Sequence, residues 1–84
     1  MRILYFANFR EKVNIAEESV DLPEHVKDIN GLINWLSAKN DNYAAAFSDK
    51  DHIRVAVNQE HVKFNAFITD GDEIAFFPPM TGGS

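Results

Sequence analysis

The chain has 84 residues, of which 45% are hydrophobic and 12% aromatic, and its formal net charge is −5. This length allows one domain with one core, and the aromatic content argues against intrinsic disorder. The acidic balance without a Lys/Arg cluster argues against nucleic-acid binding, and the absence of cysteine excludes disulfides, thiolate zinc sites and cysteine nucleophiles.

The first eight residues are too short and too poorly flanked for a signal peptide, and no later segment approaches the length of a membrane span. A small domain without disulfides is typical of a reducing compartment. We therefore expect a cytoplasmic protein.

Residues 2–7 are nearly all apolar and rich in strand formers, which predicts a central strand covered on both faces. Residues 9–13 follow as a polar loop with two apolar anchors. The alternation in residues 18–22 predicts a half-exposed strand that pairs back on the first and ends at Pro23.

A helix is predicted to begin after Asp28, whose side chain can accept main-chain N–H groups. Its apolar positions fall at i, i+3, i+4 and i+7, and they are Ile29, Leu32, Ile33 and Leu36. The helix should end within residues 37–40, with Asn40 as a left-handed cap. Residues 43–47 are expected to add one or two helical turns.

Three strands complete the pattern, at residues 53–57, 62–64 and 73–77. Turns are predicted at residues 58–60 and 69–72, and Gly71 is free to take a positive φ. The first and last strands should lie side by side in parallel at the centre, joined by the helix as a crossover.

This order predicts an α+β fold of the β-grasp (ubiquitin-like) type: a mixed sheet of about five strands with one main helix packed on one face. Residues 1–77 form the predicted β-grasp domain. Residues 78–84 form a predicted flexible C-terminal Gly-Gly tail.

The tail has a composition that suits insertion into a partner. Pro78 and Pro79 favour an extended path, and Gly82 and Gly83 have no Cβ, so a narrow channel can close around them. A carboxylate at the end of such a tail can attack the α-phosphate of ATP, and the acyl-adenylate can accept sulfur. A frayed glycine-rich end is the alternative, but the preceding aromatic strand and two prolines favour a reactive terminus.

The phenylalanines exceed what one helix can cover, and they are Phe6, Phe9, Phe64, Phe67, Phe76 and Phe77. Because strands alternate faces, Phe76 and Phe77 cannot both be buried under the helix. Phe6 and Phe77 can share the face away from the helix, where they either complete the core or form a docking patch.

No metal site is expected. The three histidines, His25, His52 and His61, are scattered without ligand-like spacing. The acidic residues 70–73 lack the spacing of a calcium-binding loop, so we interpret them as a β-turn.

Four stretches together resemble the MoaD family, the small sulfur-carrier subunits of molybdopterin synthase: residues 4–7, Arg10-Glu11, Val57-Asn58 and residues 70–83. The resemblance covers nearly the whole chain and is densest at its two ends. The early Phe-Ala and Arg-Glu elements help to separate it from the thiamine sulfur carriers (ThiS family), which share the fold and the diglycine.

The resemblance implies that the chain donates sulfur as one subunit of a molybdopterin synthase, in molybdenum cofactor biosynthesis. An adenylyltransferase related to ubiquitin-activating enzymes would adenylate the carboxylate of Gly83, which follows Gly82, and a sulfur donor enzyme would convert it to a thiocarboxylate. The tail would then enter the large synthase subunit, which would supply the catalytic side chains in a heterotetramer. The chain would bind no cofactor of its own, and ATP would be used by the activating partner. Family interface positions match Phe6, Phe77, Pro78, Pro79, Met80 and Thr81.

Ser84 departs from this pattern, because the family ends at the second glycine. With Ser84 attached, Gly83 carries an amide and cannot be adenylated. The serine is an addition made in cloning, an extension that a protease trims, or the mark of an inactive or specialised carrier.

The alternative functions are sulfur transfer for thiamine or tRNA thiolation, a non-covalent β-grasp interaction module, and a ubiquitin-like modifier.

Overall fold

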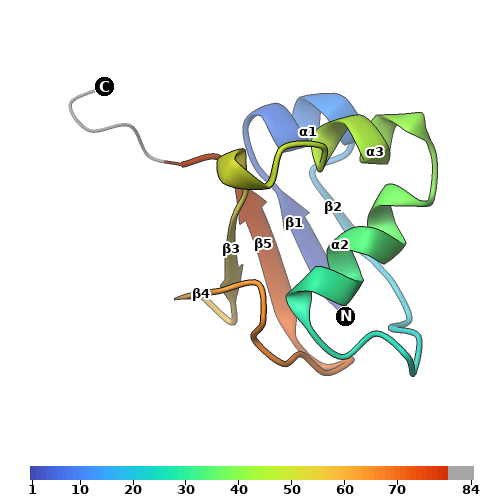
Figure 1. The fold of residues 1–84 in the computed structure, drawn as a ribbon, viewed down its shortest axis with the longest axis vertical. Coiled ribbons are helices and arrows are strands. Elements are labelled where there is room, and N and C mark those ends of the chain that lie inside the picture. The colour runs from blue at the N-terminus through green and yellow to red at the C-terminus, as the bar shows by residue number, and fades with distance from the viewer. Residues whose placement is uncertain (80–84) are drawn as a thin grey trace.

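A five-stranded mixed sheet forms one layer of the fold and helices pack against it (Figure 1). The computed structural model describes residues 1–79. Its elements in chain order are β1 (Arg2–Tyr5), α1 (Asn8–Val13), β2 (Glu17–Ser19), α2 (Ile29–Ser37), α3 (Asp41–Ala46), the 3₁₀ helix η1 (Lys50–His52), β3 (Arg54–Val57), β4 (Glu60–Val62) and β5 (Glu73–Phe77).

The sheet has the strand order β2-β1-β5-β3-β4, so the first and last strands lie side by side at its centre. β1 and β5 are parallel, with a register that runs from Arg2 opposite Glu73 to Tyr5 opposite Phe76. The other neighbouring pairs are antiparallel. This confirms the predicted β-grasp topology, in which the helices form the crossover between the two central strands.

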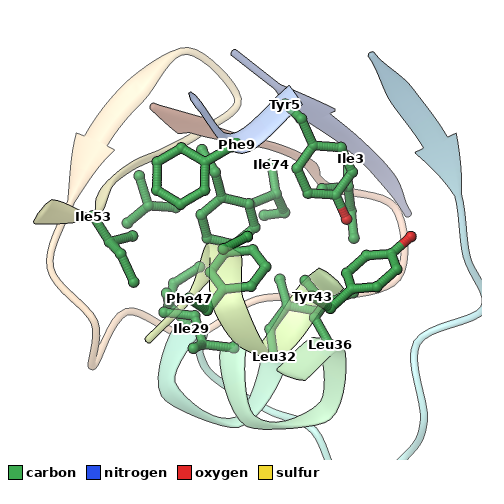
Figure 2. Packing of buried hydrophobic residues seen from close by; sticks show 14 of the residues in the cluster. Ile3, Tyr5, Phe9, Ile29, Leu32, Leu36, Tyr43, Phe47, Ile53 and Ile74 are labelled. Carbon is green, nitrogen blue, oxygen red and sulfur yellow. The ribbon is translucent and has the colours of Figure 1, made fainter. Parts of the chain in front are cut away.

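The core lies between the sheet and the helices, as Figure 2 shows from close by. The sheet contributes Ile3, Tyr5, Ile74 and Phe76, which alternate with outward-facing neighbours and are almost completely buried. Helix α2 contributes the four apolar positions that the sequence predicts, and all four are buried. Its predicted N-cap is also confirmed, because Asp28 Oδ1 accepts a hydrogen bond from the Gly31 N–H at 2.8 Å.

Residues 9–13 form helix α1 and not the predicted loop. Phe9 and Val13 lie one helical turn apart, and both are buried. Ala7 and Asn14 bound the helix with φ angles of 51° and 68°, so the chain leaves helical geometry at each end. A helix of six residues is too short for apolar periodicity to reveal, and its stability comes from tertiary packing.

Asn40 does not cap the end of α2 in a left-handed conformation. Its φ is −169°, which is extended, and its side chain accepts a hydrogen bond from the Tyr43 N–H at 3.1 Å. It therefore begins α3, which covers the predicted extra turns. Asparagine is favoured both as an N-cap and in the left-handed region, so its identity alone does not decide between the two ends.

Other boundaries also differ from the prediction. Gly71 does not take a positive φ; the turn is closed by Asp72, whose Oδ2 accepts from the Thr69 N–H at 2.9 Å. Positive φ angles occur instead at Asn58 and Gln59, between β3 and β4. This tight turn places β4 at Glu60–Val62, earlier than predicted.

The first strand is central but is not covered on both faces. Ile3 and Tyr5 face the helices, whereas Leu4 is half-buried on the opposite face. The next outward-facing position, Phe6, is 48% exposed. The sheet therefore has an outer face without a covering layer among residues 1–79.

A carboxylate between two tyrosines joins the edge strand β2 to the core. Glu18 Oε2 accepts hydrogen bonds from the hydroxyls of Tyr5 and Tyr43, each at 2.7 Å. Burial, reinforced by the Glu18 carboxylate, raises the pKa of Tyr43 to about 12 and raises that of Tyr5 as well. Lys39 Nζ lies 3.8 Å from the other Glu18 oxygen. One side chain thus links β1, β2 and α3.

We expect Glu18→Ala to lower the free energy of unfolding by about 2–3 kcal/mol, because it leaves two partly buried hydroxyls without their charged acceptor. The neighbouring Glu17→Ala is the matched control. Its pair with Arg2 is exposed to solvent, so losing it should lower stability much less than the loss of Glu18 does. Urea denaturation measures both, and equal losses would show that the tyrosine contacts add nothing to stability.

Candidate functional site

The last strand ends in an aromatic cluster that fixes the base of the tail. Phe76 is fully buried, and its ring centroid lies 4.8 Å from that of Phe47 and 6.3 Å from those of Tyr5 and Phe9. The Phe76 carbonyl accepts a hydrogen bond from the Phe6 N–H at 3.1 Å. The end of β5 is therefore held by β1, α1 and the segment after α3.

Phe77 points to the opposite face of the sheet. Its side chain is half-buried, and its ring meets the ring of His61 edge-on at a centroid distance of 5.2 Å. The prediction that Phe76 and Phe77 face opposite sides is confirmed. Phe6 lies beside the end of β5 through its hydrogen bond to Phe76, and it is among the most exposed large apolar residues described.

These side chains form part of a continuous surface, which we call the outer face: Leu4, Phe6, His61, Ala75 and Phe77. Leu4 pairs with Ala75 in the β1–β5 register, and residues at alternate positions share a face. The outer face is apolar at its centre, as expected of a protein-docking surface.

The two prolines continue from this base. Pro78 and Pro79 are both half-buried. Pro78 borders a pocket of about 320 Å³, whose other lining residues are Asn8, Phe9, Lys12, Ala45, Ala46, Ser48, Asp49 and His52. The two prolines therefore lie against the globular domain.

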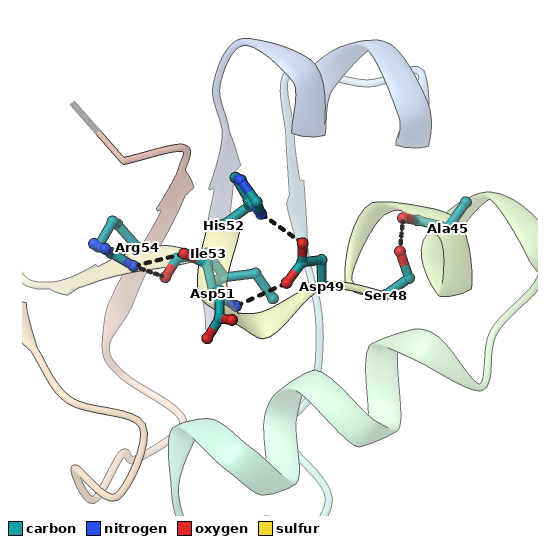
Figure 3. A network of polar contacts seen from close by, with 7 residues as sticks. All are labelled: Ala45, Ser48, Asp49, Asp51, His52, Ile53 and Arg54. Atoms are coloured by element: carbon teal, nitrogen blue, oxygen red, sulfur yellow. Dashed lines mark hydrogen bonds and ion pairs between the residues drawn. The ribbon is translucent and has the colours of Figure 1, made fainter. Parts of the chain in front are cut away.

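Hydrogen bonds hold the segment around η1 that borders this pocket (Figure 3). Asp49 caps η1 by accepting from the Asp51 N–H at 3.1 Å, and it also pairs with His52 Nδ1. The hydrogen bond with His52 lowers the pKa of the Asp49 carboxyl. Arg54 Nη1 donates to the carbonyls of Asp51 and Ile53 at 3.2 and 3.0 Å.

The remaining predicted site residues, Met80, Thr81, Gly82 and Gly83, lie outside the described residues, as does Ser84. The structure brings Phe6, Phe77 and Pro78 to the same end of the sheet. Sequence reasoning missed His61 and Arg54 as neighbours of Phe77. The signal for Arg54 was the β3–β5 register, which sets it opposite Phe77. The signal for His61 was the β3–β4 hairpin register, which sets it opposite Ala56 and requires the correct position of β4.

No group of three or more potential metal-ligating side chains occurs within residues 1–79. In the same part of the chain, no helix is long and apolar enough to cross a membrane.

Residues 3–83 match the model of the ThiS family. The molybdopterin synthase sulfur carrier subunit of Escherichia coli K12 is 40% identical over 85 residues, with 99% of each chain covered. A putative molybdopterin converting factor subunit 1 from Pyrococcus furiosus superposes with a TM-score of 0.75 at 28% identity, covering 94% of this chain and 95% of that one. SAMP1 from Haloferax volcanii superposes with a TM-score of 0.73 at 25% identity, covering 99% of this chain and 98% of that one. These similarities confirm the resemblance to the sulfur carriers and the β-grasp fold.

The geometry of β5 predicts opposite roles for its two phenylalanines. Phe76→Ala should lower the free energy of unfolding by about 3–5 kcal/mol, because it leaves a cavity in the aromatic cluster. Phe77→Ala should cost clearly less, since Phe77 is half-exposed. Thermal or urea unfolding measures the difference, and Phe76→Leu serves if the alanine variant does not fold. Equal costs at the two positions would contradict the assignment of faces.

Proposed function

The chain belongs to the ThiS family, and from its similarity to the molybdopterin synthase sulfur carrier subunits of that fold we propose that it is the sulfur-carrier subunit of a molybdopterin synthase. The observation that supports this most strongly is the extent of the family match, which continues through the tail to Gly83. The curated relative from Escherichia coli matches over 99% of its length and carries that function in its name. The reactive group is the carboxylate of Gly83, which becomes free once hydrolysis of the Gly83–Ser84 peptide bond removes Ser84. The globular domain presents this carboxylate to partner proteins in the cytoplasm.

The chemistry takes place at the chain terminus. A carboxylate oxygen of Gly83 attacks the α-phosphorus of ATP and expels pyrophosphate, which gives an acyl-adenylate. A sulfur nucleophile then attacks the acyl carbon and expels AMP together with one former carboxylate oxygen, leaving a thiocarboxylate. An adenylyltransferase holds the ATP, and a sulfur donor enzyme supplies the sulfur. The chain has no cysteine, so no side chain can carry sulfur as a persulfide, and the C-terminal carboxyl group serves as the carrier.

The outer face is the proposed docking surface for the large subunit. Phe6 and Phe77 provide aromatic anchors beside the point where the tail leaves the sheet, and buried aromatic anchors dominate many interfaces. Pro78, Pro79, Met80 and Thr81 then direct Gly82 and Gly83 into the partner. The large subunit binds the pterin precursor and supplies the catalytic side chains.

We expect the chain that ends at Gly83 to gain the mass difference between sulfur and oxygen when it is incubated with ATP, the adenylyltransferase and a sulfide source. The chain that ends at Ser84 should stay unmodified, because its Gly83 carbonyl is part of an amide. Intact-protein mass spectrometry measures both. The Escherichia coli relative, treated in parallel, shows that the partners are active.

A Gly83-ending chain that stays unmodified under these conditions would contradict the proposal. Complementation of a strain that lacks the molybdopterin carrier distinguishes molybdopterin synthesis from the other sulfur-transfer pathways. Expression of the Gly83-ending chain should restore growth that depends on molybdenum enzymes. Return of thiamine synthesis or tRNA thiolation alone would assign the sulfur to another acceptor. If a chain without residues 82–84 still restored function, the protein would act as a non-covalent interaction module.

Phe77→Ala should weaken binding to the large subunit by about 2 kcal/mol or more, which is roughly 30-fold in Kd. Phe67→Ala is the matched control, because Phe67 is 84% exposed and belongs to the loop before β5, away from the outer face. Isothermal titration calorimetry with the purified large subunit measures both. An unchanged affinity for Phe77→Ala, or an equal loss for both variants, would remove Phe77 from the interface.

A further inference from the structure

The ladder between β3 and β4 stops early and leaves a groove. Three residue pairs join the strands, and the last of them sets Val55 opposite Val62. Where the ladder stops, a groove of about 250 Å³ opens, lined by Ile53, Arg54, Val55, Val62, Lys63 and Phe64. We call it the β3–β4 groove. It lies beside β4, which is an edge strand among residues 1–79.

The bottom of the groove is apolar. Ile53 and Val55 are buried members of the main core. Val62 and Phe64 pack against the same core but remain partly exposed. The groove therefore offers aliphatic and aromatic surface that an additional apolar side chain can cover.

The margin of the groove is positively charged. Arg54 precedes and Lys63 follows the last pair of the ladder, and both line the groove. Like charges that line the same groove repel each other. Arg54 donates to two main-chain carbonyls, which hold its guanidinium in place without neutralising it. Neither Arg54 nor Lys63 forms an ion pair with an acidic side chain within residues 1–79.

We propose that the β3–β4 groove binds an extended segment of a partner protein in which a carboxylate is flanked by aliphatic side chains. The carboxylate would lie between Arg54 and Lys63 and relieve their repulsion. The aliphatic side chains would cover Val62 and Phe64, and the free edge of β4 leaves room for an extended main chain. Two unpaired cations at one groove favour an acidic occupant, although the chain as a whole has a net charge of −5. The proposal does not depend on sulfur transfer.

The test uses the full chain labelled with ¹⁵N and a synthetic, end-blocked peptide of alternating aspartate and valine. We expect amide shifts concentrated at residues 53–55 and 62–64. Lys63→Glu should raise the Kd of the peptide at least about fivefold, because the ion pair between Lys63 and the peptide carboxylate is replaced by repulsion between two carboxylates. Lys27→Glu is the matched control, with the same charge change in the segment before α2, and it should bind as the unmodified chain does.

A second peptide with asparagine in place of aspartate should bind more weakly by a similar factor. Equal binding of the two peptides, shifts centred elsewhere, or equal losses for Lys63→Glu and Lys27→Glu would overturn the proposal. Sedimentation of the chain without peptide tests whether a second copy of the chain occupies the groove. Self-association that is abolished by Lys63→Glu would also overturn the proposal, because the occupant would then be this chain and not a partner protein. Amide spectra of each variant confirm that the fold is retained.

Discussion

The parallel pairing of β1 with β5 is the contact on which the rest of the structure depends. It joins Arg2–Tyr5 to Glu73–Phe76, segments from opposite ends of the chain, at the centre of the sheet. The intervening helices make the crossover and cover the core side of both strands. Phe76 then packs against Tyr5, Phe9 and Phe47, which secures the point where the tail begins.

The alternation of side chains along β5 lets one strand stabilise the fold and also contribute side chains to the proposed docking surface. Ile74 and Phe76 are fully buried under the helices, whereas Ala75 and Phe77 belong to the outer face. A change of register by one residue would bury Phe77 and expose Phe76. The same pairing that closes the core therefore determines which aromatic ring a partner can contact, and from which end of the sheet the tail leaves.

Much of this arrangement could be predicted because its signals are strong over several residues. The stripe of α2, its Asp28 cap and the opposite faces of Phe76 and Phe77 follow from periodicity and local chemistry. Helix α1 could not be predicted, because six residues carry too little pattern and packing by Phe9 decides the outcome. Likewise, the contact of His61 with Phe77 depends on a turn with two positive φ angles, which sets the position of β4.

Native-state hydrogen exchange of the main-chain amides tests most directly whether the tail begins at the most stable part of the domain. If it does, the amides of Ile74 to Phe76 exchange only through global unfolding, and far more slowly than those of the edge strands β2 and β4. Exchange of β5 at the rate of the edge strands would contradict this account, because the tail would then lack a fixed base.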